Sequence, residues 1–225
     1  MKKIFFVLLI LITSNFAIGS PTTEEGSFAI KEWNAPTHKK PILFYISGDG
    51  GFNKFSTGLC EALNKDDFDV VALNSKIYFD DKKTPEQTTL DITNFLSKKL
   101  AGRQNQQVIF IGYSFGADVL PFVLNRLPKN FQYNVTTSFI LASSGSTDFE
   151  IHWSDLFGGN SKRSMDVVTE INKLQNKKIV IIDGTGDHHL DRNLITIKYT
   201  YFILPGGHHF DGDIDEVANQ LVTNM

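Results

Sequence analysis

The stretch that decides the expected fold is Val108-Ile109-Phe110-Ile111-Gly112-Tyr113-Ser114-Phe115-Gly116, an apolar run that leads into the pattern Gly-x-Ser-x-Gly. The apolar run predicts a buried strand, and a helical pattern begins at Ala117. Gly-x-Ser-x-Gly between a strand and a helix is typical of a nucleophile elbow, a sharp turn that exposes a serine hydroxyl to a base. We therefore predict that Ser114 is a nucleophile. The alternative is a tight strand-to-helix turn with an ordinary surface serine.

Five further apolar runs of strand length lie along the chain. They are Ile42–Ile46, Asp69–Leu73, 138–141, 179–182 and 199–204. Continuous apolar runs are typical of strands that are covered on both faces. Helical patterns separate these runs, and alternating strands and helices predict an α/β fold with a mainly parallel central sheet and helices on both faces.

The clearest helical pattern begins at Thr84. Thr84 can cap the helix, Pro85 suits its first position, and Gln87 can complete a capping box. An apolar face follows, made of Leu90, Ile92, Phe95, Leu96 and Leu100. A final helix is expected over 214–222, with the acidic stretch 211–216 capping its N-terminus.

The N-terminus has the pattern of a secretory signal peptide. Lys2 and Lys3 precede an apolar run from Ile4 to Ile12, and small residues follow at Ala17 and Gly19. The run is shorter than the roughly 20 apolar residues that a membrane-spanning helix needs. We therefore expect residues 1–19 to be cleaved, leaving one exported domain over 20–225.

Composition excludes several classes of function. The chain has 22 basic and 25 acidic residues, and removing Lys2 and Lys3 makes the balance more acidic, which argues against a nucleic-acid partner. Cys60 is the single cysteine, so no internal disulfide and no multi-cysteine metal site can form. Its apolar, helical surroundings predict a buried, inert thiol.

A serine nucleophile needs a base and an acid, and in α/β-hydrolases they follow the serine in the order acid, then histidine. Asp187 lies just beyond the run 179–182, where the carboxyl end of a strand is expected. Asp183 is the competing acid, but it lies at or inside the strand end. His208 follows a Gly-Gly turn after the run 199–204 and is preferred as the base over its neighbour His209.

The oxyanion hole needs two backbone N–H donors. One is expected from Phe115, the residue after the nucleophile. The other is expected from the glycine-rich turn Ser47-Gly48-Asp49-Gly50-Gly51, with Asp49 as the first candidate and Gly50 as the second. This turn lacks both phosphate-binding glycine patterns, so nucleotide binding is not expected.

The two histidine pairs also permit a metal site, which is the less favoured interpretation. His188-His189 and His208-His209 lie near Asp183, Asp187, Asp211 and Asp213, and these residue types bind zinc. The sequence has no His-Glu-x-x-His helix, however, and adjacent loop histidines rarely point at one ion. We expect no metal and no cofactor.

The stretch 143–165 permits two interpretations. It is rich in Gly, Ser and Asp, carries Trp153 and Phe157, and has weak periodicity. It is either an insertion over the active site or an ordinary surface loop.

Three motifs together resemble the bacterial virulence protein family VirJ/AcvB. They are Ile46-Ser47-Gly48-Asp49-Gly50-Gly51, the elbow with its continuation Gly112-Tyr113-Ser114-Phe115-Gly116-Ala117-Asp118-Val119-Leu120-Pro121, and Leu204-Pro205-Gly206-Gly207-His208-His209-Phe210-Asp211-Gly212-Asp213. The resemblance implies an exported, periplasmic α/β-hydrolase fold linked to type IV secretion. It also implies hydrolysis of aminoacylated phosphatidylglycerol, and it carries over Ser114 and His208. The chain departs from the family pattern at 184–189 and at Phe52, where a tryptophan is usual.

These observations lead to two hypotheses. In the first, the protein is a serine esterase with Ser114, His208 and Asp187 as triad and with Gly48, Gly50, Tyr113 and His209 around the substrate. The positive amine of an aminoacyl substrate would favour an acidic pocket, with Asp49, Asp118 and Asp211 as candidates, although Asp118 can equally begin the elbow helix and face solvent. In the second, the protein is a non-catalytic periplasmic adaptor that keeps the fold and binds a secretion component or secreted protein. Contact with a membrane surface is a further expectation.

Overall fold

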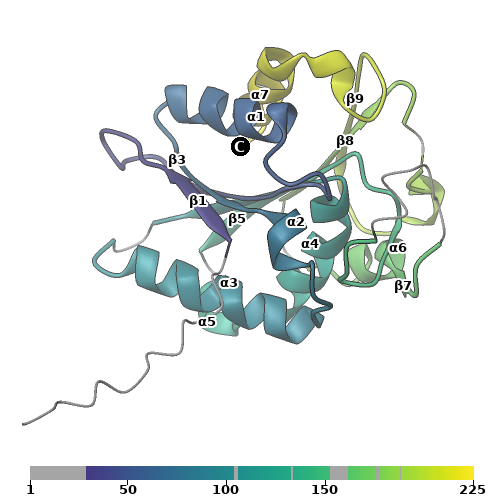
Figure 1. The fold of residues 1–225 in the computed structure, drawn as a ribbon, viewed down its shortest axis with the longest axis horizontal. Coiled ribbons are helices and arrows are strands. Elements are labelled where there is room, and N and C mark those ends of the chain that lie inside the picture. Colours follow the sequence, from purple (N-terminus) through teal and green to yellow (C-terminus); the bar gives the residue numbers. More distant parts are fainter. Residues whose placement is uncertain (1–28, 104–105, 133, 153–161, 176–177, 188) are drawn as a thin grey trace, which may run out of the picture.

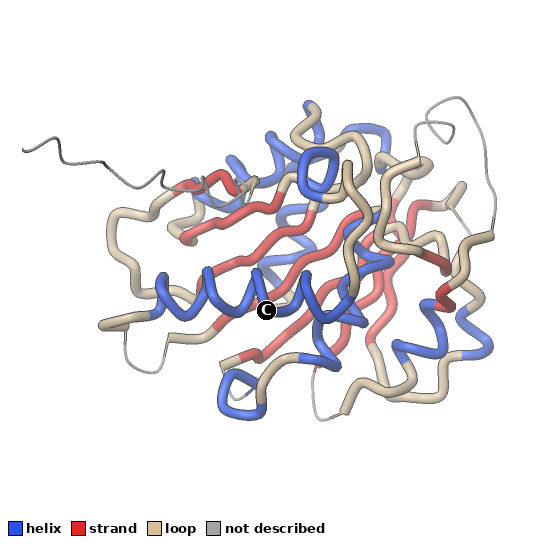
Figure 2. The backbone as a smooth tube through the Cα atoms, turned by 60° about the horizontal axis from the view of Figure 1, so that its bottom comes forward, coloured by secondary structure: helices blue, strands red, loops and turns tan. Residues whose placement is uncertain are grey.

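The structure is a computed structural model that describes residues 29–103, 106–132, 134–152, 162–175, 178–187 and 189–225. A seven-stranded sheet in the order β1-β3-β2-β4-β5-β8-β9 runs through the molecule (Figures 1 and 2). Its strands are β1 (Ile30–Trp33), β2 (Ile42–Ile46), β3 (Asp69–Leu73), β4 (Val108–Tyr113), β5 (Val135–Leu141), β8 (Lys178–Gly184) and β9 (Thr200–Leu204). Every neighbouring pair is parallel except β1 and β3.

Helices cover both faces of this sheet (Figure 1). On one face lie α1 (Lys54–Lys65) and α7 (Ile214–Thr223); on the other lie α3 (Pro85–Leu100), α4 (Phe115–Arg126) and the short α5 (Lys129–Gln132). Short elements complete the chain: α2 (Ser75–Tyr78), α6 (Val167–Ile171), η2 (Arg192–Leu194) and η3 (Phe210–Gly212). A separate pair of two-residue strands, β6 (Ser146–Thr147) and β7 (Met165–Asp166), pairs antiparallel.

The sheet has apolar side chains on both faces, which explains the continuous apolar runs. In β2, Ile42, Phe44 and Ile46 belong to the core under α3 and α4, whereas Leu43 and Tyr45 belong to the core under α1 and α7. All five are fully buried. All six predicted strands are present, and five of them are buried on both faces, so they have no polar side to alternate with. The sixth, β9, is an edge strand whose residues are mostly half-buried or exposed, so burial on both faces was wrong for the run 199–204.

Strand β1 was not predicted. It is a short edge strand whose residues are half-buried or exposed, so its sequence carries no apolar run. Its register sets Trp33 opposite Val70 of β3.

The predicted helix starts are confirmed. Thr84 and Gln87 form the capping box of α3, and Asp213 caps α7 by accepting from the Glu216 N–H at 3.1 Å. One part of the predicted α3 face is wrong, because Leu90 is 59% exposed while Ile92 and Leu96 are buried. Cys60 is fully buried within α1, and burial raises the pKa of its thiol, as expected of an inert cysteine.

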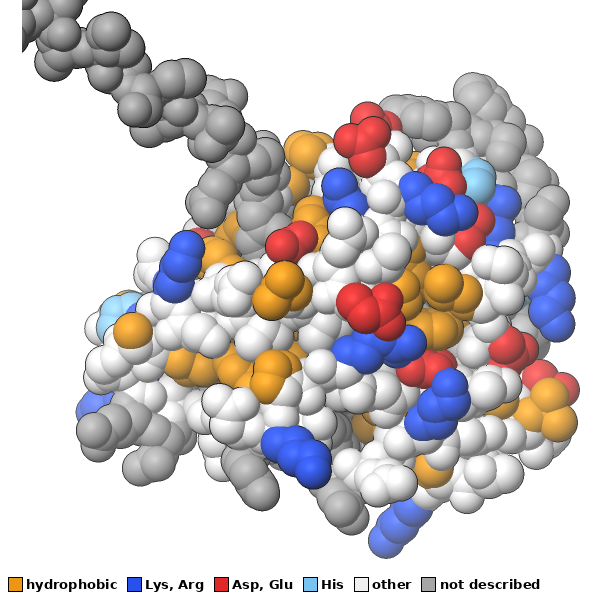
Figure 3. All heavy atoms as spheres, turned by 90° about the horizontal axis from the view of Figure 1, so that it is seen from below, with side chains coloured by type: hydrophobic (Ala, Val, Ile, Leu, Met, Phe, Trp, Pro, Cys, Tyr) orange, Lys and Arg blue, Asp and Glu red, His pale blue; other side chains and the backbone are white. Residues whose placement is uncertain are grey.

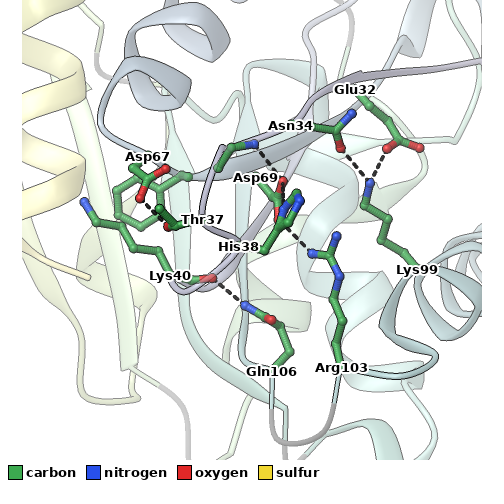
Figure 4. A network of polar contacts seen from close by, with 12 residues as sticks. Glu32, Asn34, Thr37, His38, Lys40, Asp67, Asp69, Lys99, Arg103 and Gln106 are labelled. Carbon is green, nitrogen blue, oxygen red and sulfur yellow. Dashed lines mark hydrogen bonds and ion pairs between the residues drawn. The ribbon is translucent and has the colours of Figure 1, made fainter.

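A polar network at the amino end of the parallel strands ties the chain before β2 to the sheet (Figure 4). The carboxylate of Asp69, at the start of β3, is 1% exposed and accepts from the Ala35 N–H at 2.9 Å, from Arg103 at 2.7 Å and from His38 at 2.7 Å. Burial acts to raise the pKa of Asp69, but these hydrogen bonds outweigh it and the pKa is lowered.

The surface seen from the α3 side carries Lys and Arg side chains interspersed with Asp and Glu (Figure 3). No helix among the described residues is long and apolar enough to cross a membrane. The expected signal peptide, 1–19, lies outside the described residues.

Candidate active site

Ser114 lies at a sharp turn between β4 and α4. Its backbone angles, φ 54° and ψ −122°, are rare for a residue with a side chain. A Cβ on Gly116 would approach the Ile46 carbonyl oxygen closer than 3.0 Å, and a Cβ on Gly112 would approach the Gly116 carbonyl oxygen equally closely. Both glycines are therefore required by close backbone packing, which is the geometry of a nucleophile elbow.

The structure brings Ser114, His208 and Asp187 together in one hydrogen-bonded chain. Ser114 Oγ lies 2.7 Å from His208 Nε2, and His208 Nδ1 lies 2.9 Å from Asp187 Oδ2. These distances fit a neutral imidazole that donates from Nδ1 to Asp187 and accepts the Ser114 proton at Nε2. The arrangement supplies a hydroxyl, a base and an orienting carboxylate in the geometry that nucleophilic catalysis needs.

Backbone contacts between two loops hold Asp187 and His208 in place. Thr185 N–H donates to the Leu204 carbonyl at 2.9 Å, and Gly186 N–H donates to the Gly206 carbonyl at 2.9 Å. A Cβ on Gly184 would collide with the Gly207 carbonyl oxygen, so the loops pack backbone against backbone. Asp187 itself is 3% exposed.

The two competing residues lie elsewhere. Asp183 lies inside β8. Its charge acts on Tyr201 of β9, where it adds to the burial of the Tyr201 hydroxyl and raises the pKa of Tyr201 to about 12. His209 is exposed, and its Nδ1 is in hydrogen-bond contact with the Tyr113 hydroxyl. Burial and the neighbouring His208 lower the pKa of His209.

His208 is subject to opposing effects on its protonation. Burial disfavours the imidazolium, but the hydrogen bond and charge of Asp187, with smaller contributions from Asp49 and Asp118, outweigh it. The pKa of His208 is consequently raised above its ordinary value.

The two expected oxyanion donors lie beside the serine. Phe115 is the first residue of α4, where a backbone N–H has no acceptor within its own helix. The Gly51 N–H donates to the Gly48 carbonyl at 3.0 Å and closes a turn around Asp49 and Gly50, so the Asp49 N–H stays outside that turn's hydrogen bond. Both Asp49 and Phe115 line the cavity that contains Ser114.

That cavity has a volume of about 720 Å³ and a mixed but mainly acidic lining. The ionisable residues in its described lining are Asp49, Asp118, Asp148, Glu150, Asp166 and Asp191, with Lys162 and Arg163 as the basic residues and His152, His189 and His208 as the histidines. The Asp49 carboxylate makes no hydrogen bond or ion pair with any residue that the structure describes.

Much of the cavity wall comes from the stretch whose role the sequence left open. Residues 144–148 and 150–152, with 162, 163 and 166, all line it, so the described parts of this stretch lie over the site. Trp153 and Phe157 lie outside the described residues. No spacing in the sequence marked Ser144, Asp148 or His152 as cavity residues, because their placement depends on how the stretch folds back.

Not every residue expected to contact the substrate lines this cavity, and these contacts stay predictions. The residues described as lining this cavity do not include Gly48, Gly50, Tyr113 or His209. Tyr113 is buried on the α1 and α7 side of the sheet, where it packs on Phe55 and donates to the His208 carbonyl at 3.1 Å. Asp118 does not face solvent but is buried, and Asp211 is exposed and absent from the described lining.

One neighbour of the triad was considered only as a metal ligand. His189 Nε2 lies 3.3 Å from Asp187 Oδ1, whereas His208 contacts the other carboxylate oxygen, Oδ2. His188 lies outside the described residues. Among the described residues, no group of three or more His, Cys, Asp or Glu side chains is arranged to hold a metal ion.

The parallel sheet, the strained elbow and the placement of acid and histidine on the loops after β8 and β9 define an α/β-hydrolase fold. Solved structures with this fold superpose well on the chain. A lipase-esterase related protein from Clostridium acetobutylicum ATCC 824 has a TM-score of 0.62 at 15% identity, covering 88% of this chain and 100% of its own. The enol-lactonase from Burkholderia xenovorans LB400 has a TM-score of 0.63 at 14% identity, covering 86% of this chain and 95% of its own. MenH from S. aureus has a TM-score of 0.60 at 11% identity, covering 87% of this chain and 97% of its own.

Residues 41–225 match the family described as bacterial virulence protein (VirJ), and the chain belongs to that family. None of the curated proteins matches the chain. The resemblance drawn from the three motifs is thereby confirmed.

Proposed function

We propose that this protein is a serine hydrolase that cleaves a carboxylic ester, with Ser114 as nucleophile, His208 as general base and Asp187 as the orienting carboxylate. The observation that carries the proposal is the continuous contact from Ser114 Oγ through the His208 ring to Asp187, at 2.7 and 2.9 Å. Both distances lie within the range over which a base accepts a proton from its nucleophile. The esterase and lactonase among the structural neighbours support the same reaction class.

In the first half-reaction Ser114 Oγ attacks the ester carbonyl carbon as its proton passes to His208 Nε2. The carbonyl oxygen becomes an oxyanion between the N–H groups of Phe115 and Asp49. One such donor is worth roughly 3–4 kcal/mol of transition-state stabilisation. The tetrahedral intermediate then collapses, and His208 gives its proton to the departing alcohol.

In the second half-reaction water attacks the acyl-Ser114 ester. His208 takes a proton from that water, and the same N–H groups stabilise the second oxyanion. Collapse releases the carboxylic acid and returns the proton to Ser114.

The substrate class that we propose is an aminoacylated lipid headgroup ester such as aminoacylated phosphatidylglycerol. Among the described residues, six acidic and two basic side chains line the cavity, and a net negative lining favours a substrate with a positive amine. Asp49 is the carboxylate best placed for this, because it lies on the oxyanion turn and is unpaired among the described residues.

The amine preference is tested with a pair of substrates that differ only in charge. We expect alanine 4-methylumbelliferyl ester to be hydrolysed with a higher kcat/KM than its N-acetyl form, and Asp49→Asn to reduce that preference. Equal kcat/KM values for the two esters in the wild type would contradict the proposed preference for a positive amine.

We also propose that residues 1–19 direct export and that the mature protein, 20–225, works in the periplasm. A lipid substrate requires contact with the membrane surface, and components of a type IV secretion system are the partners that the family implies. Mass spectrometry of the protein from a periplasmic fraction tests the first point, since a mature N-terminus near residue 20 is expected.

The adaptor remains the rival class of function. It predicts serine, histidine and acid pointing apart, whereas here the three side chains are within hydrogen-bond distance. The geometry therefore favours the enzyme.

The decisive experiment is labelling of the purified mature protein with a fluorophosphonate probe, which reacts with an activated serine. We expect the wild type to label and Ser114→Ala and His208→Ala to lose labelling. His209→Ala is the matched control, because His209 is the adjacent imidazole but contacts Tyr113 rather than Ser114. If the folded wild type is not labelled, the hydrolase proposal is wrong and the adaptor becomes the favoured function.

A further inference from the structure

Asp118 is a buried carboxylate that the proposed chemistry does not use. It lies in the first turn of α4, four residues after Ser114, is 3% exposed, and contributes to the cavity lining. A buried carboxylate is unfavourable unless hydrogen bonds satisfy it, so its partners identify its role.

All of the hydrogen bonds found for the Asp118 carboxylate come from one short turn. Oδ1 accepts from Ser143 Oγ at 2.6 Å, from the Ser144 N–H at 2.9 Å and from the Gly145 N–H at 3.2 Å. Oδ2 accepts from Ser144 Oγ. One side chain on the helix of the nucleophile thus holds both the backbone and the hydroxyl groups of residues 143–145.

This turn is the base of the cavity wall. Gly145 accepts from the Val167 N–H at 3.0 Å, and the next two residues form β6, which pairs with β7. The Ser146 Oγ also accepts from the Arg163 N–H at 3.0 Å. Residues 144–148 and 163 line the cavity, so the position of the wall follows from the position of this turn.

The far end of the same stretch is attached independently. Ile151 N–H donates to the Phe79 carbonyl at 2.9 Å, and the buried Phe149 ring packs edge-on against Phe79 and Phe122. Between this attachment and β5, Asp118 supplies the polar contacts that join the stretch to α4.

We propose that Asp118 is a positioning residue that latches the turn 143–145 onto the nucleophile's helix and so sets the shape of the cavity in which the substrate is bound. This rests on the proposed hydrolase function, because the cavity matters as a substrate site only if Ser114 is the nucleophile. Asp118 acts through hydrogen bonds accepted from the turn and touches no reacting atom.

We expect the latch to form without a negative charge on residue 118. Burial, only partly offset by the hydrogen bonds from the turn, raises the pKa of Asp118 to about 6, so the neutral form is accessible within the fold. An asparagine has the same shape, keeps one acceptor oxygen for the three Oδ1 bonds, and can donate to Ser144 Oγ. Asp118→Asn should therefore preserve the latch, whereas Asp118→Ala removes it.

The test combines hydrogen exchange with kinetics on two esters that share a leaving group, p-nitrophenyl acetate and Nα-benzyloxycarbonyl-lysine p-nitrophenyl ester. In Asp118→Ala we expect faster amide exchange over 143–151 and about a tenfold higher KM for the lysine ester, with kcat for the acetate within about threefold of the wild type. Asp118→Asn should restore both readouts. Asp69→Ala is the matched control, because it removes an equally buried aspartate from the other end of the sheet.

Unchanged exchange and unchanged KM in Asp118→Ala would overturn the proposal, and so would equal impairment of Asp118→Asn, since charge would then be the cause. If Asp118→Ala does not fold, the double variant Ser143→Ala/Ser144→Ala removes the two hydroxyl donors instead and should open the same segment. A wild type that hydrolyses neither ester would refute the hydrolase proposal, and the exchange data would then decide the latch by themselves.

Discussion

The imidazole of His208 is placed between a serine hydroxyl and a buried carboxylate, and in the proposed mechanism its protonation decides whether Ser114 can be activated. Burial favours the neutral ring, but Asp187 stabilises the charged ring more strongly, and the charge of Asp49 adds to this effect. A general base must be neutral before it can accept a proton. The activity of this site should therefore rise as the pH rises through the pKa of His208.

The first prediction follows from the sign of that shift. Since the pKa of His208 is raised, the acidic limb of the kcat/KM profile should lie above pH 6.5, the ordinary value for histidine. Asp49→Asn removes one negative charge and should move the limb toward lower pH. The profile is measured with p-nitrophenyl acetate, and a limb that stays in place would show that the Asp49 carboxylate does not act on His208.

A second prediction concerns the acid. Asp187→Asn keeps the size of the side chain but removes the charge and favours the wrong imidazole tautomer, so kcat should fall by about 10⁴. His189→Gln, which changes the other side-chain contact of Asp187, should leave most of kcat intact. A similar loss in both variants would assign the orienting role to the pair rather than to Asp187 alone.

At the scale of elements, the elbow depends on the close approach of β4, α4 and the end of β2. Gly116 lies against the Ile46 carbonyl oxygen, and Gly112 lies against the Gly116 backbone. Neither contact leaves room for a methyl group.

The third prediction tests this packing. Gly116→Ala should lower the free energy of unfolding by about 3 kcal/mol, because the added methyl group forces backbone atoms apart. Gly207→Ala is the matched control, since nothing lies within 4 Å of the added Cβ there. Urea denaturation followed by circular dichroism measures both, and equal stability of the two variants would contradict the packing argument.

At the scale of the whole molecule, the candidate site lies at the carboxyl ends of the parallel strands, and a stabilising polar network lies at their amino ends. The carboxyl ends of β4, β8 and β9 lead into Ser114, Asp187 and His208, as in other open α/β sheets. The amino end of β3 carries Asp69, whose network with Ala35, His38 and Arg103 attaches the chain before β2 and the end of the α3 region (Figure 4).

The fourth prediction separates the site from the network. Asp69→Ala leaves Arg103 and the Ala35 N–H without their partner and should cost about 3 kcal/mol of stability, while fluorophosphonate labelling of Ser114 in the folded protein stays unchanged. Because the pKa of Asp69 is lowered in the fold, its contribution is present above the usual aspartate pKa and is lost as the pH falls below it. The stability difference between wild type and variant should therefore shrink in acid.

The fold was predictable to a large extent for identifiable reasons. Strands such as β2 and β8 are buried on both faces and leave continuous apolar runs, and α3 is marked by its capping box. β1 left no such signal because it is a half-exposed edge strand. Leu90 was wrongly predicted to be buried, because the sequence of a helix does not show how much of its apolar face the rest of the protein covers.

The site was predictable in part. Ser114 was identified because its turn demands glycines at two set positions, and those glycines are visible in the sequence. For Asp118 the sequence left two positions open, in an acidic pocket or facing solvent, and the structure places it buried in the cavity lining. Its burial was not predictable, because it depends on the turn 143–145, which begins 25 residues further along the chain. The cavity-lining role of Asp148 and His152 was invisible for the same reason, since it arises where the stretch folds back over Ser114.

The sequence by itself determined the α/β class, the elbow and the order serine, acid, histidine, because each is written in local patterns of apolar runs, glycines and caps. Only the tertiary structure decided which of two adjacent histidines lies against Ser114 and which of two aspartates lies against that histidine. Neighbouring loop residues point in different directions, and their directions are set by the packing of Gly184 and Gly186 against the loop after β9. Such contacts join segments that are distant in the sequence, so no local pattern contains them.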